Sequence, residues 1–226
     1  MSEKIRNSVS LFVWFISYFI VFVLSKIFLS LHVQYEDKSF KEIKKPVIVV
    51  SNHKNSFDPW VIFVSLPFRV LLGLLPIRPF AKRTFKNDSF LGTLSSLKII
   101  GFVYYIYNVI TIPDVDSFEG KTKPLVDALN NKNSILMFPE GKIILEEDVG
   151  EFKKGVVYLQ EKTGVPILPC AVRYGGKGLF RRKAFVTFGK TFYSPKKLFK
   201  NKEDYSEARE HLRKEVLRLY RKNNVG

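Results

Sequence analysis

The sequence predicts an α/β fold: a mostly parallel central sheet flanked by helices, with an apolar membrane-anchor helix at the N-terminus. Two observations support this prediction. From residue 47 onward, short apolar and β-branched runs alternate with segments of helical spacing, which is typical of a layered and largely parallel sheet. Residues 9–31 instead form a long apolar stretch with few interruptions. With 226 residues and 46% hydrophobic content, the chain can form one domain with a sizeable core.

The expected elements follow from local patterns. Strands are expected at residues 47–50, 70–74, 99–105, 135–138, 167–172 and 183–188, where β-branched, aliphatic or aromatic residues cluster. Helices are expected at residues 59–66, 85–98, 121–130 and 152–163, the last of which stops at Gly164. A final helix is indicated by apolar residues at intervals of three and four: Tyr205, Ala208, Leu212, Val216 and Leu219. We interpret this stripe as packing against the chain's own core.

Residues 1–33 are interpreted as a membrane anchor, followed by one domain over residues 34–226. The apolar stretch runs from Val9 to Leu24, and it resumes at residue 27 after Ser25 and Lys26. About 20 apolar residues are needed to cross a bilayer, so the anchor either spans the membrane or lies in one leaflet. A cleavable signal peptide is the alternative, but no small-residue cleavage site follows the stretch.

The chain is strongly basic, with a formal net charge of +16 at pH 7. Anionic lipid on a cytoplasmic membrane face attracts such a surface by about 1 kcal/mol for each nearby Lys or Arg. A basic surface also suits nucleic acid, but no nucleic-acid motif is present, and the apolar segment favours a membrane partner. We therefore expect a cytoplasmic membrane location with the domain on the cytoplasmic face, and no nucleic-acid partner.

Cysteine usage argues against two further classes of protein. The single cysteine, Cys170, lies in an apolar run and is expected to be a small core residue. One cysteine cannot form an intrachain disulfide framework, and no Cys/His cluster has zinc spacing, so no metal is expected.

The most informative segment follows the strand expected at residues 47–50. His53 and Asp58 stand five positions apart, where a strand gives way to a helix, and can form a base with an orienting carboxylate. No Gly-x-Ser-x-Gly elbow is present, so we interpret the pair as a base that acts directly on a substrate hydroxyl. The structural alternative is that Asp58, which precedes Pro59, caps the helix and that His53 is an ordinary loop histidine.

A second concentration of chemistry lies at residues 135–142, with the sequence Ile-Leu-Met-Phe-Pro-Glu-Gly-Lys. Glu140 and Gly141 follow the end of an expected strand, where ligands collect in open α/β sheets. Glycine also allows a ligand to approach the backbone closely. Taken alone, the segment is equally typical of an ordinary turn with a solvated glutamate.

Together these motifs resemble those of the glycerolipid acyltransferase family, which includes the bacterial 1-acylglycerol-3-phosphate acyltransferases. His53 to Asp58 matches the family's H-x4-D motif, and residues 138–141 match its F-P-E-G motif. Four more segments are similar to family motifs and occur in the family's order: Phe80-Ala81-Lys82, residues 101–107 at motif two, the F-K-x-G of residues 152–155, and the V-P-I-x-P of residues 165–169.

The resemblance implies transfer of a fatty acyl group from an acyl thioester to a hydroxyl of a lysolipid, with 1-acylglycerol-3-phosphate as the expected acceptor. It implies that His53 is the general base and that Asp58 orients it. It implies no metal and no cofactor, with acyl-CoA or acyl carrier protein as the co-substrate. Substrate-binding roles are implied for Glu140, Gly141, Lys142, Lys82 and Gly101.

Two motifs depart from the family pattern. Motif two ends in Tyr107 instead of the usual arginine, and motif three continues with Lys142 and Ile143 instead of Thr-Arg or Thr-Ser. Both departures concern the acceptor, because arginine suits phosphate through paired hydrogen bonds. Lys82 and Lys142 are candidates to supply point charges instead. The alternatives are an acceptor without that phosphate, such as another lysophospholipid or an aminolipid, and a lipid-binding scaffold without catalysis.

Overall fold

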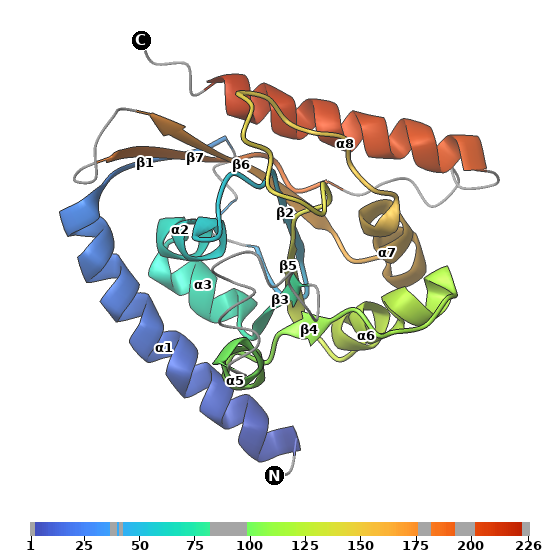
Figure 1. The fold of residues 1–226 in the computed structure, drawn as a ribbon, viewed down its shortest axis with the longest axis horizontal. Helices are drawn as coiled ribbons and strands as arrows, with labels where there is room; N and C mark the ends of the chain where they lie inside the picture. Colours follow the sequence, from blue (N-terminus) through green and yellow to red (C-terminus); the bar gives the residue numbers. More distant parts are fainter. Residues whose placement is uncertain are drawn as a thin grey trace.

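The computed structural model describes residues 3–36, 40, 43–81, 99–175, 182–192 and 202–222. In these residues a seven-stranded sheet has the order β1-β7-β6-β2-β5-β3-β4 (Figure 1). The strands are β1 (Leu29–Tyr35), β2 (Ile48–Ser51), β3 (Ile77–Ala81), β4 (Ile110–Thr111), β5 (Ser134–Met137), β6 (Ile167–Gly175) and β7 (Arg182–Phe188). Neighbouring strands are parallel except β6 and β7, which pair antiparallel. The predicted mostly parallel sheet is confirmed.

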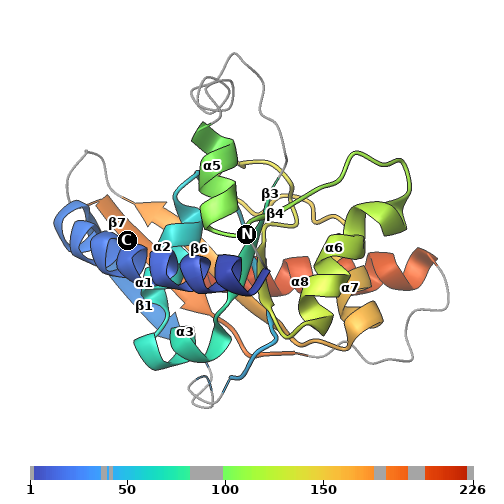
Figure 2. The ribbon, with the colours of Figure 1, turned by 90° about the horizontal axis from the view of Figure 1, so that it is seen from below.

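Helices cover both faces of the sheet, as Figures 1 and 2 show. They are α1 (Glu3–Phe28), α2 (Asp58–Ser65), α3 (Phe68–Leu74), α5 (Ile99–Ile106), α6 (Phe118–Asn130), α7 (Gly155–Thr163) and α8 (Lys202–Lys222). The first four lie on one face, and α6, α7 and α8 lie on the other. The result is a three-layer α/β arrangement.

The central strand β2 contributes side chains to two hydrophobic cores, one on each face of the sheet. Ile48 and Val50 pack into the core with α6, α7 and α8, while Val49, together with Val47 just before the strand, packs into the core with α1, α2 and α3. Successive side chains of a strand point to opposite faces, so a strand buried on both sides is a continuous apolar run. This is why the strand was recognisable from the sequence.

Most of the expected elements are present. The strands expected at 47–50, 135–138, 167–172 and 183–188 are β2, β5, β6 and β7, and the helices expected at 59–66, 121–130 and 152–163 are α2, α6 and α7. Gly164 ends α7 in the left-handed conformation, with φ 66°, as a helix C-cap commonly does. Leu212, Val216 and Leu219 of α8 are fully buried in the domain core, and so is Cys170. The helix expected at 85–98 lies outside the described residues.

Two predicted strands are wrong. Residues 70–74 and 99–105 lie in helices α3 and α5. A short apolar run does not distinguish a strand from a helix segment by its period, and both runs are of this kind. Three strands were also missed: β1, which directly follows a helix; β3, which an arginine and a proline interrupt; and β4, which has two residues.

The apolar N-terminal segment divides at Phe28. Within the described residues, Leu11–Phe28 is the one helical stretch that length and composition alone would allow to cross a membrane, and 11% of it is buried. Residues 29–35 leave the helix and form β1, which pairs with β7 from Leu29 opposite Arg182 to Tyr35 opposite Phe188. The helix therefore ends five residues before the expected domain boundary, and residues 29–33 belong to the sheet.

Candidate active site

Two loops meet where the central parallel strands end. β2 and β5 are neighbours, with Ile48 opposite Ile135 and Val50 opposite Met137. The residues that follow them are therefore brought to the same edge of the sheet, which is where open α/β sheets bind ligands. These residues are the H-x4-D and F-P-E-G segments, which lie 87 positions apart in the chain at His53 and Glu140.

His53 and Asp58 form the predicted pair. The Nδ1 atom of His53 lies 2.8 Å from Oδ2 of Asp58, and because a carboxylate only accepts, Nδ1 carries the proton. The Asp58 side chain is fully buried, whereas the His53 side chain is 20% exposed. Phe138 stacks on the imidazole, with ring centroids 4.2 Å apart and planes inclined by 17°. The ring is thus fixed in orientation and tautomer, with Nε2 left for a substrate.

Asp58 does not act as the helix cap that the sequence also allowed. It is the first residue of α2, and the N-cap is Phe57, which makes no side-chain cap hydrogen bond. The Asp58 carboxylate instead turns back to the preceding loop, where Oδ2 accepts from the N–H groups of Lys54 at 2.5 Å and Asn55 at 2.9 Å. This buried charge is compensated by loop hydrogen bonds.

Tyr174, which the sequence interpretation missed, completes the surroundings of Asp58. Its hydroxyl, on β6, donates to Oδ1 of Asp58 at 2.8 Å. Burial and then the negative charge of Asp58 raise the pKa of Tyr174, so the hydroxyl stays protonated and remains a donor. The sequence signal was a tyrosine just beyond the V-P-I-x-P segment, but nothing in that segment links it to Asp58.

Glu140 connects the two loops. Its Oε2 accepts from the N–H of His53 at 2.7 Å, and its Oε1 accepts from the N–H of Gly150 at 2.7 Å. The residue is 4% exposed, and this burial raises the pKa of its carboxyl although both hydrogen bonds lower it. Ile144 also donates its N–H to the carbonyl of His53 at 2.8 Å. Glu140 therefore positions the backbone at His53, while its predicted contact with substrate stays a prediction.

Lys54 and Asn52 hold the same loop from two sides, and neither was singled out by the sequence. The Lys54 ammonium donates to the carbonyls of Glu146 and Asp148, each at 2.5 Å, and burial lowers its pKa. The Asn52 amide bonds to both the N–H and the carbonyl of Val172, at 2.8 and 2.9 Å. The end of β2 is thus tied to β6 and to the loop at 141–150.

Gly141 has φ 69°, a conformation that L residues rarely adopt. A Cβ atom there would lie 2.4 Å from Nζ of Lys153, so the lysine side chain occupies the space that the glycine leaves. Lys142 follows directly and is exposed. Two lysines therefore lie at this turn, one predicted and one missed.

The other predicted substrate-binding residues lie elsewhere or are not described. Lys82 lies outside the described residues. Gly101 is exposed on α5, and among the described residues a Cβ there would meet nothing within 4 Å, so packing against this part of the chain does not require a glycine. Tyr107, at the position of the family arginine, packs between Trp14 and Trp60 with centroids 5.0 Å from each. Its hydroxyl hydrogen-bonds Ser17 Oγ at 2.5 Å, so this side chain serves helix packing.

Over the described ranges, no three His, Cys, Asp or Glu side chains come together in a way that could hold a metal ion. The chemistry available at the site is that of an oriented imidazole, which can take a proton from a hydroxyl and return it.

The fold and site define a class of α/β proteins that place an H-x4-D histidine–aspartate pair beyond the central strands of a mostly parallel sheet. The family described as Acyltransferase matches residues 32–173, more than half of the chain, and the chain belongs to this family. The predicted family relationship is confirmed.

Curated relatives agree with this assignment. The chain is 33% identical over 129 residues to a protein of Mycoplasma genitalium named probable 1-acyl-sn-glycerol-3-phosphate acyltransferase, a match that covers 57% of this chain and 44% of that one. It is 25% identical over 183 residues to the human 1-acyl-sn-glycerol-3-phosphate acyltransferase beta, covering 81% of this chain and 59% of the relative. The chain thus matches about half the length of these relatives.

A solved structure supports the fold. The crystal structure of the 1-acyl-sn-glycerophosphate (LPA) acyltransferase PlsC from Thermotoga maritima superposes with a TM-score of 0.60, covering 88% of this chain and 74% of that one. The two sequences are 22% identical, so this likeness bears on the fold alone.

Proposed function

We propose that this chain transfers a fatty acyl group from a thioester to the free hydroxyl of a lysolipid, most specifically 1-acylglycerol-3-phosphate, to give phosphatidic acid. The observation that carries the proposal is the 2.8 Å contact between His53 Nδ1 and the buried Asp58 carboxylate, in a member of the Acyltransferase family. The names of the curated relatives support the same acceptor.

In the proposed reaction, Nε2 of His53 takes the proton of the acceptor hydroxyl while the oxygen attacks the thioester carbonyl. Asp58 stabilises the imidazolium that forms, since Nδ1–H already points at its carboxylate. The tetrahedral intermediate then collapses with cleavage of the C–S bond, and the leaving thiolate takes the proton from His53. Proton transfer of this kind contributes about 10²–10⁴-fold to the rate. No metal or other cofactor takes part in this scheme, and the donor is acyl-CoA or acyl carrier protein.

The acceptor phosphate is proposed to be held by lysine charges instead of arginines. Lys142 and Lys153 both lie at the Gly141 turn, next to the residue that braces His53. Lys82 remains a candidate from the sequence. An ammonium is a point charge that binds phosphate without the paired geometry of arginine, so we expect weaker discrimination among phosphate-bearing acceptors.

A membrane location follows from the acceptor and from the chain itself. A lysolipid stays at the bilayer, and α1 presents an apolar surface beside the domain. We propose attachment to the cytoplasmic membrane with the domain on the cytoplasmic face, where the basic domain meets anionic lipid.

The test is thioester consumption by detergent-purified protein with a panel of lysolipids, using acyl-CoA and acyl carrier protein donors in turn. Turnover on lysophosphatidic acid that disappears in His53→Ala supports the proposal. Turnover only on acceptors without the terminal phosphate would mean that lysophosphatidic acid is not the substrate. Such an acceptor is the second candidate, because Tyr107 stands at the position of the family arginine and packs between two tryptophans. Lipid binding without turnover on any acceptor would overturn catalysis and favour a lipid-binding scaffold.

A further inference from the structure

The outer side of α5 is apolar and exposed. Phe102 is 64% exposed, and Val103 and Tyr105 are exposed beside it. The helix, Ile99–Ile106, contains no charged residue. Exposed apolar side chains gathered on one short helix indicate a surface that contacts something other than water.

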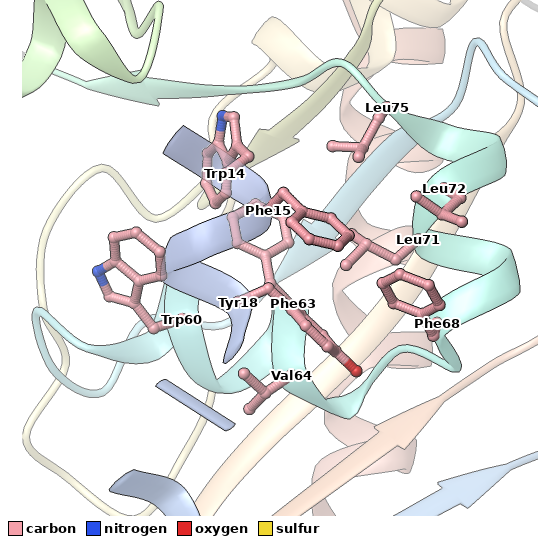
Figure 3. Close-up of a pocket in the computed structure, with 10 residues that line it drawn as sticks. All are labelled: Trp14, Phe15, Tyr18, Trp60, Phe63, Val64, Phe68, Leu71, Leu72 and Leu75. Atoms are coloured by element: carbon pink, nitrogen blue, oxygen red, sulfur yellow. The ribbon is translucent and has the colours of Figure 1, made fainter. Parts of the chain in front are cut away.

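α1 has one side on the domain and the other side exposed. Trp14 and Ser25 are buried, so the inner side is in contact with the protein over much of the helix. Figure 3 shows Trp14 and Tyr18 among the residues that line a small apolar pocket between α1, α2 and α3. Trp14 packs on Trp60 and Phe63 of α2, with ring centroids 5.3 and 4.6 Å away, and Tyr18 packs on Phe68 of α3 at 5.6 Å. On the outer side, exposed apolar residues recur along the whole helix: Phe12, Ile16, Phe19, Ile20, Val23, Leu24 and Ile27. No charged residue occurs from position 7 to position 25.

This packing bears on how α1 meets a bilayer. A helix that crossed the membrane while packed sideways on the domain would carry the domain's polar surface into hydrocarbon, which is costly. A helix with one apolar side outward instead lies in the plane of the membrane interface. Lys26, whose ammonium lies 5.3 Å from the centroid of the Phe22 ring, can reach the headgroups from that position.

α5 and α1 meet on the same side of the molecule. Tyr107, which follows α5, hydrogen-bonds Ser17 and packs on Trp14. Figure 2 looks onto this side and shows α5 rising at a steep angle from α1. The two helices are therefore in contact, and no charged residue occurs at positions 7–25 of α1 or anywhere in α5.

We propose that the outer sides of α1 and α5 form one surface that contacts lipid, so that α5 is a second membrane-contacting element. The partner is the interfacial region of a bilayer, because the exposed side chains of this surface are aliphatic and aromatic, with Lys26 at one end, while the chain as a whole is strongly basic.

The surface is directly connected to the active site. Trp60 lies two residues after Asp58 in α2, and its ring packs on Trp14 at 5.3 Å and on Tyr107 at 5.0 Å between centroids. The lipid contact itself does not depend on the proposed function. Only its purpose does, which is to set the height of His53 above an acceptor held in the bilayer.

The test measures depth directly and does not depend on turnover. Single cysteines are introduced at Phe102, at Phe12, Phe19 and Ile27 of α1, and at exposed Lys214 of α8 as a control, and each carries an environment-sensitive fluorophore. Cys170 is fully buried and is left in place. The full chain is reconstituted in vesicles of phosphatidylcholine and phosphatidylglycerol that contain lipids with a quencher at a shallow or a deep position.

We expect the label at position 102 to be quenched as strongly as the three α1 labels, all by the shallow quencher, and the label at 214 not to be quenched. Positions 12 and 27 lie about 22 Å apart along the helix at about 1.5 Å per residue. A spanning helix would therefore place position 19 deepest and the other two near opposite interfaces, which would overturn the proposal. A label at 102 that behaves like the control would overturn it too, including the case in which α5 binds another protein.

A second variant relates depth to activity. Phe102→Asn should reduce turnover on vesicle-borne acceptor by about tenfold, since the large apolar side chain that α5 would bury in the bilayer is replaced by a polar one. Activity on acceptor in detergent micelles should be unchanged, and the matched variant Val115→Asn, at another exposed apolar residue, should behave as the unmodified protein does. Equal loss in micelles and vesicles would overturn the role of α5. No turnover in any condition would count against the proposed function and leave the depth measurement valid.

Discussion

The hydroxyl of Tyr174 donates a 2.8 Å hydrogen bond to Oδ1 of Asp58, the carboxylate oxygen that His53 does not use. The two residues lie 116 positions apart and meet because β6 pairs with β2. Tyr174 therefore fixes the carboxylate that orients the imidazole, and in the proposed reaction it would act through Asp58.

The first prediction concerns this contact. Tyr174→Phe should lower kcat by about tenfold or more with little change in KM, because a hydrogen bond to a charged group is worth about 1.5–3 kcal/mol. The rates are normalised to folded protein, so that lost stability is not counted as lost catalysis. Tyr158→Phe on α7 is the matched control and should leave kcat unchanged. A fall in folded protein with unchanged kcat per folded molecule would show that Tyr174 serves stability only.

The second prediction concerns the lysines at the Gly141 turn. Lys142→Met and Lys153→Met should each raise KM for lysophosphatidic acid by about tenfold, since each removes a charge-assisted contact to phosphate. Lys154→Met is the control, because the Lys154 ammonium lies over the Phe118 ring, 4.4 Å from its centroid. An equal rise in all three variants would indicate a general charge effect. No rise in either test variant would leave Lys82 as the remaining candidate.

A feature of this structure could be predicted from the sequence where it depends on residues that are neighbours in the chain. Each of the strands β2 and β5 is followed directly in the sequence by the segment that carries its site residues. His53, Asp58 and the Glu140 turn could therefore be found from the local sequence pattern alone. The contacts that complete the site join residues that are not neighbours in the sequence. Tyr174 reaches Asp58 only through strand pairing, and Lys153 reaches Gly141 only because residues 139–153 fold back, with the N–H of Lys153 donating to the carbonyl of Pro139.

The errors have equally physical causes. α3 and α5 are short apolar segments in which helix and strand give similar patterns, and tertiary packing decides between them. The direction in which a side chain points is also absent from the pattern. The Glu140 carboxylate, for example, faces two backbone N–H groups within the protein, which the sequence of the turn does not reveal, and its predicted contact with substrate stays a prediction.

The third prediction concerns acid stability. The Arg218 side chain, with help from Lys222, lowers the pKa of Glu36 to about 2, and the three residues tie the end of β1 to α8. Because the folded pKa lies below the usual value of 4.5, this contribution to stability is present above pH 4.5 and is lost as the pH falls towards 2. Glu36→Gln should therefore lower the unfolding temperature at pH 7, by an amount that corresponds to about 1 kcal/mol.

Thermal unfolding in detergent at a series of pH values tests this. The difference between the two proteins should shrink below pH 4.5, whereas Glu207→Gln, at an exposed glutamate near the start of α8, should show no difference at any pH. A difference between the Glu36 variant and the unmodified protein that stayed constant down to pH 2 would mean that the carboxylate charge is not its source.

The last prediction concerns Lys54, which lies inside the H-x4-D segment and bonds to the loop at 141–150. Its ammonium is held by the carbonyls of Glu146 and Asp148 and lies 4.9 Å from the centroid of the Tyr220 ring. Lys54→Met keeps most of the apolar stem but removes the ammonium, so the carbonyls of Glu146 and Asp148 lose the hydrogen bonds that it donates. We expect a loss of about 1–3 kcal/mol in the free energy of unfolding.

The same change should loosen the loop that carries Gly150, and with it the Glu140 brace on the backbone of His53. We therefore expect kcat to fall and a glutamate-specific protease to cut faster after Glu146 and Glu147, which are exposed. Lys121→Met, at an exposed lysine of α6, is the matched control and should change neither rate. The prediction would be wrong if Lys54→Met lost stability while loop cleavage and kcat stayed the same. Lys54 would then stabilise the fold without positioning His53. Any effect of the loop on catalysis would rest on Glu140 alone.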